Sequence, residues 1–222
     1  MSREFNLQPP QAYARLRETL SARGGAPAVA PALGEVARVL AASRPGGVFL
    51  CLGRGAGEMA AWILDGMDLS GRLVVVVEDS DEAEVLRPIL GDDLRITVHA
   101  QEAVAFLGDV RDHRFDLITD LSSGLPADLT RLALGRLALG AFYMSLHGAP
   151  QLSEMLSGQT TGAGDREAVL DPAGFAFAHL SGELGVSLIV RGPQRVQAKR
   201  RGGRRTRQGV TPLFSPKAPR RR

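Results

Sequence analysis

The sequence is poor in cysteine and has no long apolar run. Cys51 is the one cysteine among 222 residues, and it lies in a predicted buried strand, so no disulfide framework can form within one chain. No segment approaches the ~18 uninterrupted apolar residues that would predict a membrane-spanning helix, and Met1 to Pro10 lack the apolar run of a secretory leader. We therefore expect a cytoplasmic protein without a membrane span.

Acidic residues are absent from the end of the chain. Residues 191–222 hold 12 of the 27 Lys and Arg residues and no Asp or Glu, so residues 1–190 carry 15 basic and 24 acidic side chains. The formal net charge of +3 therefore divides into an acidic body, with a net charge of −9, and a basic tail. The acidic body is a poor surface for nucleic acid. The tail is expected to be disordered. It is either a solvated terminus or a segment that binds the phosphates of nucleic acid or anionic lipid without recognising a base sequence.

Apolar segments alternate with helical patterns through most of the chain. Helices are predicted over 11–22, 32–43, 57–66, 81–90, 101–107 and 127–135, and strands over 47–52, 72–78, 94–98, 115–119 and 140–146. This alternation predicts βαβ units and a doubly wound, mostly parallel α/β sheet. Two further apolar runs, 174–180 and 185–190, predict a C-terminal antiparallel hairpin that completes seven strands. We divide the chain into an N-terminal helical extension (1–45), the sheet domain (46–191) and the basic tail (192–222).

Three glycines follow the first predicted strand at alternate positions. Gly53, Gly55 and Gly57 precede a predicted helix, and the next strand ends at Glu78, 21 residues after Gly57. This layout is typical of a nucleotide-type cofactor site at the carboxyl end of a parallel sheet. Glycine permits a tight turn and a close approach of the backbone to a ligand. An acid at the tip of the second strand can accept both hydroxyls of a ribose.

The spacing of the glycines distinguishes between cofactors. A dinucleotide fingerprint reads G-x-G-x-x-G, whereas here the third glycine comes one residue early and Glu58 takes the dinucleotide position. An acid at the start of a helix repels a pyrophosphate, which binds at the positive end of the helix dipole. The pattern G-x-G-x-G suits S-adenosylmethionine, which carries no phosphate. A glycine-rich turn without a ligand is the alternative.

Three further motifs carry a resemblance to a known family. The segment from Gly25 to Gly34 contains V-x-P-x-x-G before the first strand, Ala100-Gln101-Glu102 follows the third strand, and Phe115 to Asp120 forms the fourth. Over about residues 12–191 the chain resembles bacterial, and especially actinobacterial, catechol-type O-methyltransferases, which are class I S-adenosylmethionine-dependent enzymes. The resemblance implies the Rossmann-like methyltransferase fold for residues 46–191, S-adenosylmethionine as cofactor, and a homodimer with contacts through the N-terminal helices.

The resemblance also implies which residues bind the cofactor. They come from the glycine turn and the strand ends: Gly53, Gly55 and Gly57 at the methionine end, Glu78 at the ribose, Asp79, Ala100 and Gln101 at the adenine, and Asp120 beside the methyl group. Arg54 lies inside the turn, where the family often has Thr. It either meets the carboxylate of the cofactor, pairs with Glu78 or Glu58, or obstructs the pocket.

Departures from the family pattern bear on the chemistry. Leu121-Ser122 follow Asp120 where the family has a second acid, and His147-Gly148 end the fifth strand where metal-dependent members have Asp-Asn. The lysine base of the family is also missing, because residues 1–190 contain no lysine. A Mg²⁺ site needs several oxygen ligands, so we expect no metal.

Two side chains remain as candidates for the base that unmasks an acceptor hydroxyl. Asp120 is one, although capping the following helix is an equally good explanation for it. His147 is the other, with an exposed loop histidine as its alternative.

We therefore expect an S-adenosylmethionine-dependent O-methyltransferase that acts on a small hydroxylated molecule without a metal. A catalytically inactive protein that keeps the fold for binding or scaffolding is the first alternative, and Arg54 and the altered fourth strand favour it. The second is a nucleic-acid methyltransferase that uses the basic tail to hold its substrate.

Overall fold

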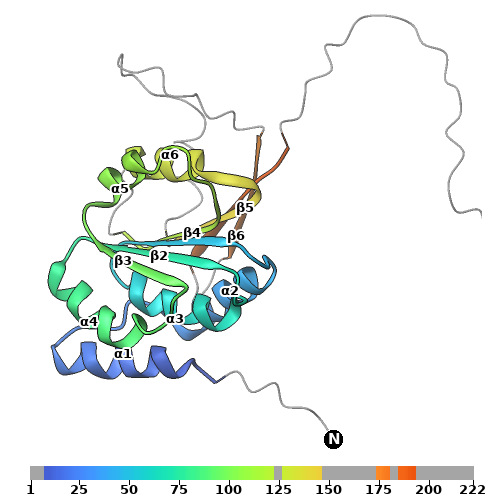
Figure 1. Cartoon of the computed structure of the whole chain (residues 1–222). Coiled ribbons are helices and arrows are strands. Elements are labelled where there is room, and N and C mark those ends of the chain that lie inside the picture. Colours follow the sequence, from blue (N-terminus) through green and yellow to red (C-terminus); the bar gives the residue numbers. More distant parts are fainter. Residues whose placement is uncertain (1–7, 123–126, 147–173, 181–184, 194–222) are drawn as a thin grey trace, which may run out of the picture.

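The computed structural model describes residues 8–122, 127–146, 174–180 and 185–193 (Figure 1). The helices are α1 (Gln11–Ala22), α2 (Pro31–Ala42), α3 (Ala56–Gly66), α4 (Ser80–Leu90), α5 (Ala103–Asp109) and α6 (Ala127–Gly135). The strands are β1 (Val48–Leu52), β2 (Arg72–Val77), β3 (Ile96–Ala100), β4 (Phe115–Asp120), β5 (Leu137–Ser145), β6 (Phe175–Leu180) and β7 (Val186–Arg191). The predicted tail beyond residue 193 and His147 lie outside the described residues. Within the described ranges, no helix is both long and apolar enough to cross a membrane.

The sheet confirms the predicted fold class. Its strand order is β3-β2-β1-β4-β5-β7-β6, in which β1 to β5 pair in parallel and β7 pairs antiparallel with both β5 and β6. The chain leaves β1 toward β2 on one side and later returns to β4 on the other. The carboxyl end of β1 is therefore the point where the strand order reverses, which is where open α/β sheets bind ligands.

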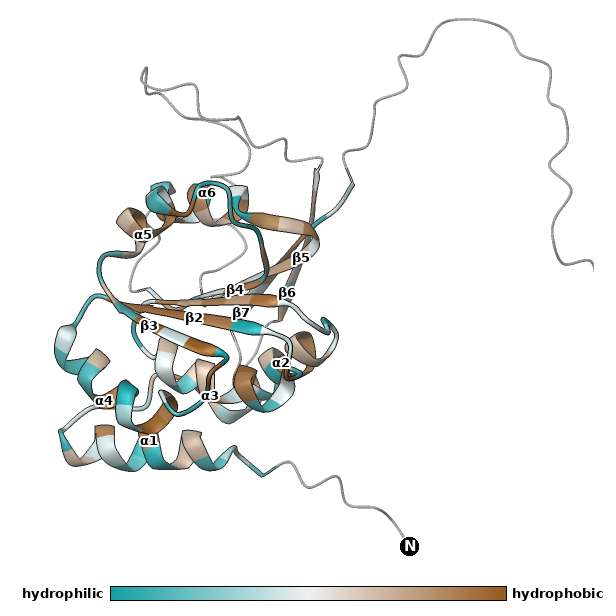
Figure 2. Cartoon of the chain, in the orientation of Figure 1, coloured by the Kyte–Doolittle hydropathy of each residue, from teal (hydrophilic) through white to brown (hydrophobic). Residues whose placement is uncertain are grey.

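Helices cover both faces of the sheet. Figure 1 shows α1 to α4 on one face and α5 and α6 on the other. Alternate side chains of β1 serve the two layers, since Phe49 and Cys51 join the core under α1 to α4 whereas Leu50 and Leu52 join the core under α5 and α6. A strand buried on both faces has no polar alternation. Figure 2 accordingly shows central strands such as β2 and β4 coloured mainly as apolar.

The first two helices belong to the same apolar core as the glycine turn. Tyr13 and Leu16 of α1 are buried, and the ring of Tyr13 lies 5.2 Å from that of Trp62 in α3. Helix α2 approaches α3 closely because Gly34 faces the indole of Trp62, where an added Cβ would collide with the ring. The N-terminal helices therefore hold the segment between them against the sheet domain. The domain boundary at residue 45 remains a prediction.

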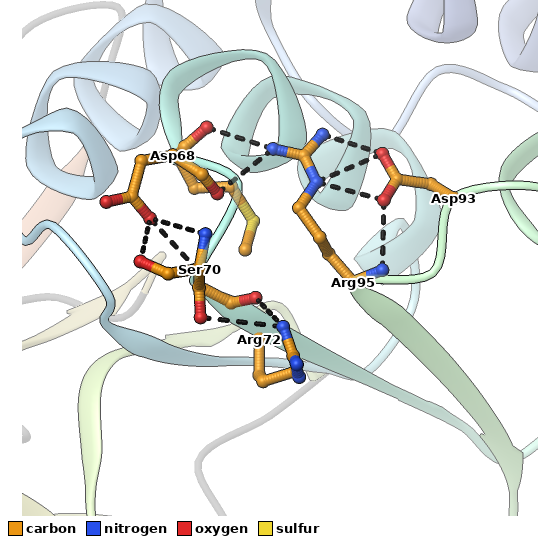
Figure 3. A network of polar contacts seen from close by, with 7 residues as sticks. Asp68, Ser70, Arg72, Asp93 and Arg95 are labelled. Atoms are coloured by element: carbon orange, nitrogen blue, oxygen red, sulfur yellow. Dashed lines mark hydrogen bonds and ion pairs between the residues drawn. The ribbon is translucent and has the colours of Figure 1, made fainter.

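A polar network fixes two loops at the amino-terminal edge of the sheet. Arg95 donates to both carboxylate oxygens of Asp93, at 2.6–3.2 Å, and to the carbonyl oxygens of Met67 and Asp68 (Figure 3). The carboxylate of Asp68 accepts the amides of Gly46, Ser70 and Gly71. These contacts join the loops that lead into β2 and β3, at the edge opposite the glycine turn.

Four predicted boundaries illustrate how the structure differs from the sequence pattern. Strand β3 begins two residues later than predicted, because Asp93 accepts the amide of Arg95 in a turn, and helix α5 also begins two residues later, after Glu102. Helix α4 begins at Ser80, and its N-cap is Asp79, which accepts the amide of Asp81 at 2.8 Å. Strand β5 begins at Leu137 instead of residue 140, because Leu137 already pairs with Phe115 of β4; Gly140, with a positive φ of 74°, lies in the register shift that follows.

Candidate functional site

The three glycines of the turn are required for different reasons. Gly53 and Gly55 adopt φ values of +83° and +85°, the left-handed region that residues with a side chain rarely occupy. A Cβ on Gly53 would lie 2.5 Å from the backbone nitrogen of Ser122, and one on Gly55 would collide with the Cβ of Ala28. Gly57 lies in α3, where a Cβ would collide with Leu86 of α4. The turn therefore keeps its backbone free of side chains at the carboxyl end of β1.

Most of the predicted cofactor residues lie along one edge of the sheet. Leu52, the last residue of β1, pairs with Val76 of β2 and with Asp120 of β4, so these strands end level with one another. Glu78 follows β2 directly and is exposed. Ala100 ends β3 in register with Val77, whose carbonyl oxygen accepts the amide of Gln101 at 3.0 Å. The strand order therefore brings Ala100, Gln101, Glu78, Gly53 and Asp120 to this edge in sequence across four strands.

A cavity of about 320 Å³ lies beside the glycine turn, between the end of α1 and the start of α4. Its lining comprises Leu20, Arg23, Gly25, Ala26, Ala28, Arg54, Gly55, Glu58, Asp79, Asp81, Glu82 and Val85. Arg54, Gly55 and Asp79 are therefore brought together around it, whereas Glu78, Ala100, Gln101 and Asp120 are outside its lining. Four carboxylates and two guanidinium groups line the cavity, so its charged wall carries a net negative charge.

Glu82 shows how crowded this wall is with negative charge. Partial burial raises the pKa of its carboxyl, and the neighbouring carboxylates of Asp79 and Glu58 raise it further. The backbone of Gly55 and the guanidinium of Arg54 act in the opposite direction and lower it. Glu82 thus links the start of α4 to the glycine turn, a role that the sequence did not indicate.

Glu58 has hydrogen-bond partners that sequence reasoning did not find. Its side chain is only 1% exposed. Its two carboxylate oxygens accept the amides of Ala28 at 3.2 Å and Val29 at 3.1 Å, so it joins the first turn of α3 to the segment between α1 and α2. The signal was an acid at the third position of a helix among apolar neighbours, but its partners are 30 and 29 residues away.

Asp120 is enclosed at the end of β4. It is fully buried, and its Oδ2 accepts the hydroxyl of Tyr143 at 2.6 Å while its Oδ1 accepts the amide of Ser122 at 3.0 Å. Burial, followed by the charge of Asp120, raises the pKa of Tyr143 well above the usual tyrosine value. Sequence reasoning missed Tyr143, although a tyrosine in a buried apolar strand requires a hydrogen-bond partner. The next segment, 123–126, lies outside the described residues, so the helix-capping role of Asp120 stays open.

Metal ligands do not gather in the part of the chain that the structure describes. No group of three or more His, Cys, Asp or Glu side chains there is arranged to hold a metal ion. Cys51 lies in the core, where burial raises the pKa of its thiol to about 12. The described residues therefore offer backbone amides, carboxylates and guanidinium groups to a ligand.

No protein-family model matches this sequence, and no curated protein matches it either. Solved structures match its fold. The O-methyltransferase TomG from Streptomyces achromogenes, involved in tomaymycin synthesis and crystallised with S-adenosylmethionine, has a TM-score of 0.67 at 16% identity, over 85% of this chain and 93% of TomG. A methyltransferase from Geobacter sulfurreducens has a TM-score of 0.63 at 18% identity, over 82% of this chain and 88% of that one.

An O-methyltransferase from Bacillus cereus, in complex with S-adenosylhomocysteine, has a TM-score of 0.62 at 16% identity, over 85% of this chain and 94% of its own. Each of these three matches covers more than four fifths of the chain. Together with the strand order, they show that this chain has the Rossmann-like fold of S-adenosylmethionine-dependent methyltransferases.

Proposed function

We propose that this protein is an S-adenosylmethionine-dependent O-methyltransferase that acts on a small hydroxylated molecule. The observation that carries the proposal is the bare glycine turn at the switch point of the sheet, with Glu78 at the end of the neighbouring strand. Two proteins of the same fold, TomG and the Bacillus cereus O-methyltransferase, were crystallised with S-adenosylmethionine and S-adenosylhomocysteine, which supports the choice of cofactor.

The residues at this edge fit such a cofactor. The turn fits because Gly53 and Gly55 carry no side chains and leave their backbone open to close approach. We propose that Gly53, Gly55 and Gly57 contact the methionine end, with Arg54 at its carboxylate, and that the exposed carboxylate of Glu78 accepts the ribose hydroxyls. The adenine then lies toward Asp79, Ala100 and Gln101. When bound, the cofactor supplies an electrophilic methyl group, and the chain orients the acceptor oxygen in line with it.

The acceptor hydroxyl must lose its proton, and we propose Asp120 and His147 as the residues that serve this step without a metal. Asp120 is fully buried and already accepts hydrogen bonds from Tyr143 and Ser122. It therefore reaches an acceptor only if these hydrogen bonds are exchanged, and otherwise it holds the tip of β4 in place. His147 follows β5 closely in sequence, and histidine is the residue type most often used as a general base. We further propose that the protein acts as a homodimer in the cytoplasm.

Calorimetric titration with S-adenosylmethionine and S-adenosylhomocysteine, with and without Mg²⁺, tests the proposal. We expect micromolar binding that Glu78→Ala abolishes and that Mg²⁺ leaves unchanged. Glu84→Ala is the matched control, because Glu84 is an exposed acid of α4 outside the cavity lining, and it should bind as the wild type does. Absence of binding to either ligand would overturn the enzyme assignment.

The enclosure of Asp120 favours one second candidate, a protein that keeps this fold to bind a ligand without turnover. With Asp120 held by Tyr143 and Ser122, the described residues leave no free carboxylate at the end of β4. Incubation with S-adenosylmethionine and a panel of phenols and catechols separates the two candidates. Formation of S-adenosylhomocysteine that depends on the acceptor supports the enzyme, and cofactor binding without any product supports the binding protein.

A further inference from the structure

The segment between α1 and α2, residues 23–30, forms a wall of the cavity, and we call it the connector. Arg23, Gly25, Ala26 and Ala28 of the connector face the cavity across from the glycine turn and the start of α4. The connector also approaches the turn directly, because Gly55 leaves no room for a Cβ beside Ala28. The position of the connector therefore decides the width of the cavity.

Three hydrogen bonds, two of them buried, hold the connector in this position. The amides of Ala28 and Val29 donate to the two oxygens of Glu58, and the hydroxyl of Tyr13 donates to the carbonyl oxygen of Val29 at 2.9 Å. Val29 is fully buried and Glu58 nearly so. Hydrogen bonds to a charged acceptor are stronger than those between neutral groups. The carboxylate also lies in the first turn of α3, where the helix dipole favours a negative charge.

We propose that Glu58 is a positioning residue that fixes the connector against the glycine turn and thereby sets the affinity for the cofactor. This inference rests on the proposed function, since the cofactor is taken to bind at that turn. A carboxylate suits the task because it has two acceptor oxygens and no donor, so it can accept two adjacent backbone amides. In Glu58→Gln one amide would face the NH₂ group of glutamine, a donor against a donor, and in Glu58→Asp the shorter side chain would not reach both.

Hydrogen exchange in the full chain tests the contact itself. In the wild type the amides of Ala28 and Val29 are expected to be protected. In Glu58→Gln the amide that faces the NH₂ group should exchange about 10- to 100-fold faster, as expected for the loss of a hydrogen bond to a charged group, whereas the amide on the remaining oxygen should change less. Amides within α1 and at the centre of α3 should keep their rates, a pattern that general destabilisation would not give.

Calorimetric titration of the same proteins with S-adenosylmethionine tests the consequence. The Kd of Glu58→Gln should rise about 10- to 100-fold. The matched control is Asp65→Asn, which removes the ion pair with Arg38 at the other end of α3 and should leave both the Kd and the exchange of Ala28 and Val29 unchanged. If Glu58→Gln does not fold, Glu58→Asp replaces it, and the same two measurements apply.

The outcomes separate this inference from the proposed function. Faster exchange with an unchanged Kd would overturn the link between Glu58 and cofactor affinity, and unchanged exchange would overturn the contact. A wild type that binds no S-adenosylmethionine would overturn the proposed function and the cofactor role of Glu58 together, whereas the exchange rates of Ala28 and Val29 would still decide whether Glu58 holds the connector.

Discussion

At the scale of single residues, glycines that look alike in the sequence have very different tolerance for a side chain. Gly53 combines a left-handed conformation with backbone atoms of Leu121 and Ser122 at short range. Gly108 in α5 and Gly135 in α6 have nothing within 4 Å of an added Cβ. The tolerance depends on which atoms the fold places opposite each glycine. The same Gly→Ala substitution can therefore be compared at a crowded position and at an open one.

Gly53→Ala is expected to lower the free energy of unfolding by ~1–3 kcal/mol, because alanine is strained in the left-handed region. It should also abolish binding of S-adenosylmethionine, because Ser122 cannot move away without shifting the end of β4. Gly108→Ala should be neutral or stabilising, since alanine is the better helix former. Denaturant unfolding measures the stability of both variants, and calorimetric titration measures their affinity for S-adenosylmethionine. A Gly53→Ala protein with wild-type affinity would contradict the predicted loss of binding.

Asp93 gives the molecule a defined response to acid. Its hydrogen bonds from Arg95, followed by the charge of that guanidinium, hold the pKa of the Asp93 carboxyl below the usual 3.8. A carboxyl whose pKa is lower in the folded state stabilises the fold above the unfolded value and loses that contribution as the pH falls through the folded value. Asp93→Asn should therefore flatten the loss of stability below about pH 4. Melting temperatures between pH 3 and pH 7 measure it, with Asp128→Asn, in an exposed pair with Arg131, as the control expected to follow the wild-type curve.

At the scale of elements, the contact between α2 and α3 has no spare room. Gly34 lies against the face of Trp62, which also contacts Tyr13 and the guanidinium of Arg38. A larger residue at Gly34 would push α2 away from α3 and would thereby displace the connector that enters α2.

Gly34→Ala is accordingly expected to destabilise the fold by ~1–3 kcal/mol, the usual cost of overpacking a core. It should also change the emission of Trp62, the one tryptophan of the chain. Gly135→Ala adds the same methyl group at a position with open space around it, so it should change neither the stability nor the emission of Trp62. Equal stability of the two variants would show that α2 can shift without cost.

Most elements could be predicted because their signals are local. Apolar periodicity, Gly and Pro indicated every helix and strand that the structure describes. The alternation of strands and helices predicted a mostly parallel sheet, and the last two apolar runs predicted the antiparallel hairpin. The start of β3 and the irregular part of β5 could not be predicted. They depend on the turn of Asp93 with Arg95 and on the conformation of Gly140, which reflect how neighbouring strands meet.

The site could be predicted only where motif and topology agree. The glycine turn, Glu78 and Gln101 come together because parallel strands end at one edge. The partners of Glu58 and Asp120 could not be predicted, because their hydrogen bonds join segments 30, 29 and 23 residues apart without any repeating pattern. Whether an acidic side chain is buried depends on the three-dimensional fold, whereas the sequence shows only that an acidic residue is present.

At the scale of the whole molecule, a stabilising polar network and the proposed cofactor site lie at opposite edges of the sheet. The network of Asp68, Asp93 and Arg95 lies at the amino-terminal edge, and the glycine turn lies at the carboxyl edge. Charge is also divided, between an acidic body and a basic tail. Substitutions at the amino-terminal edge or in the tail should therefore leave cofactor affinity unchanged.

If the tail contacts nucleic acid, its binding should depend on salt and not on base sequence. Single-stranded RNA should bind the full chain near 50 mM salt and be released by about 200 mM. Replacing Lys199, Arg200 and Arg201 by serine should make the slope of log K against log salt shallower by about 2. Fluorescence anisotropy measures both, with Arg131→Ser on α6 as the control. A slope that does not change would leave the tail as a solvated terminus.

The burial of Cys51 has a practical consequence for following the connector in solution. Because the thiol is enclosed in β1 and burial raises its pKa to about 12, a maleimide should not modify the folded wild-type chain. Ala26→Cys places a thiol at an exposed position of the connector, and a fluorophore attached there would be the single label on an otherwise native protein. Energy transfer from Trp62 to that fluorophore would then report, in real time, whether the wall of the cavity moves when a ligand arrives.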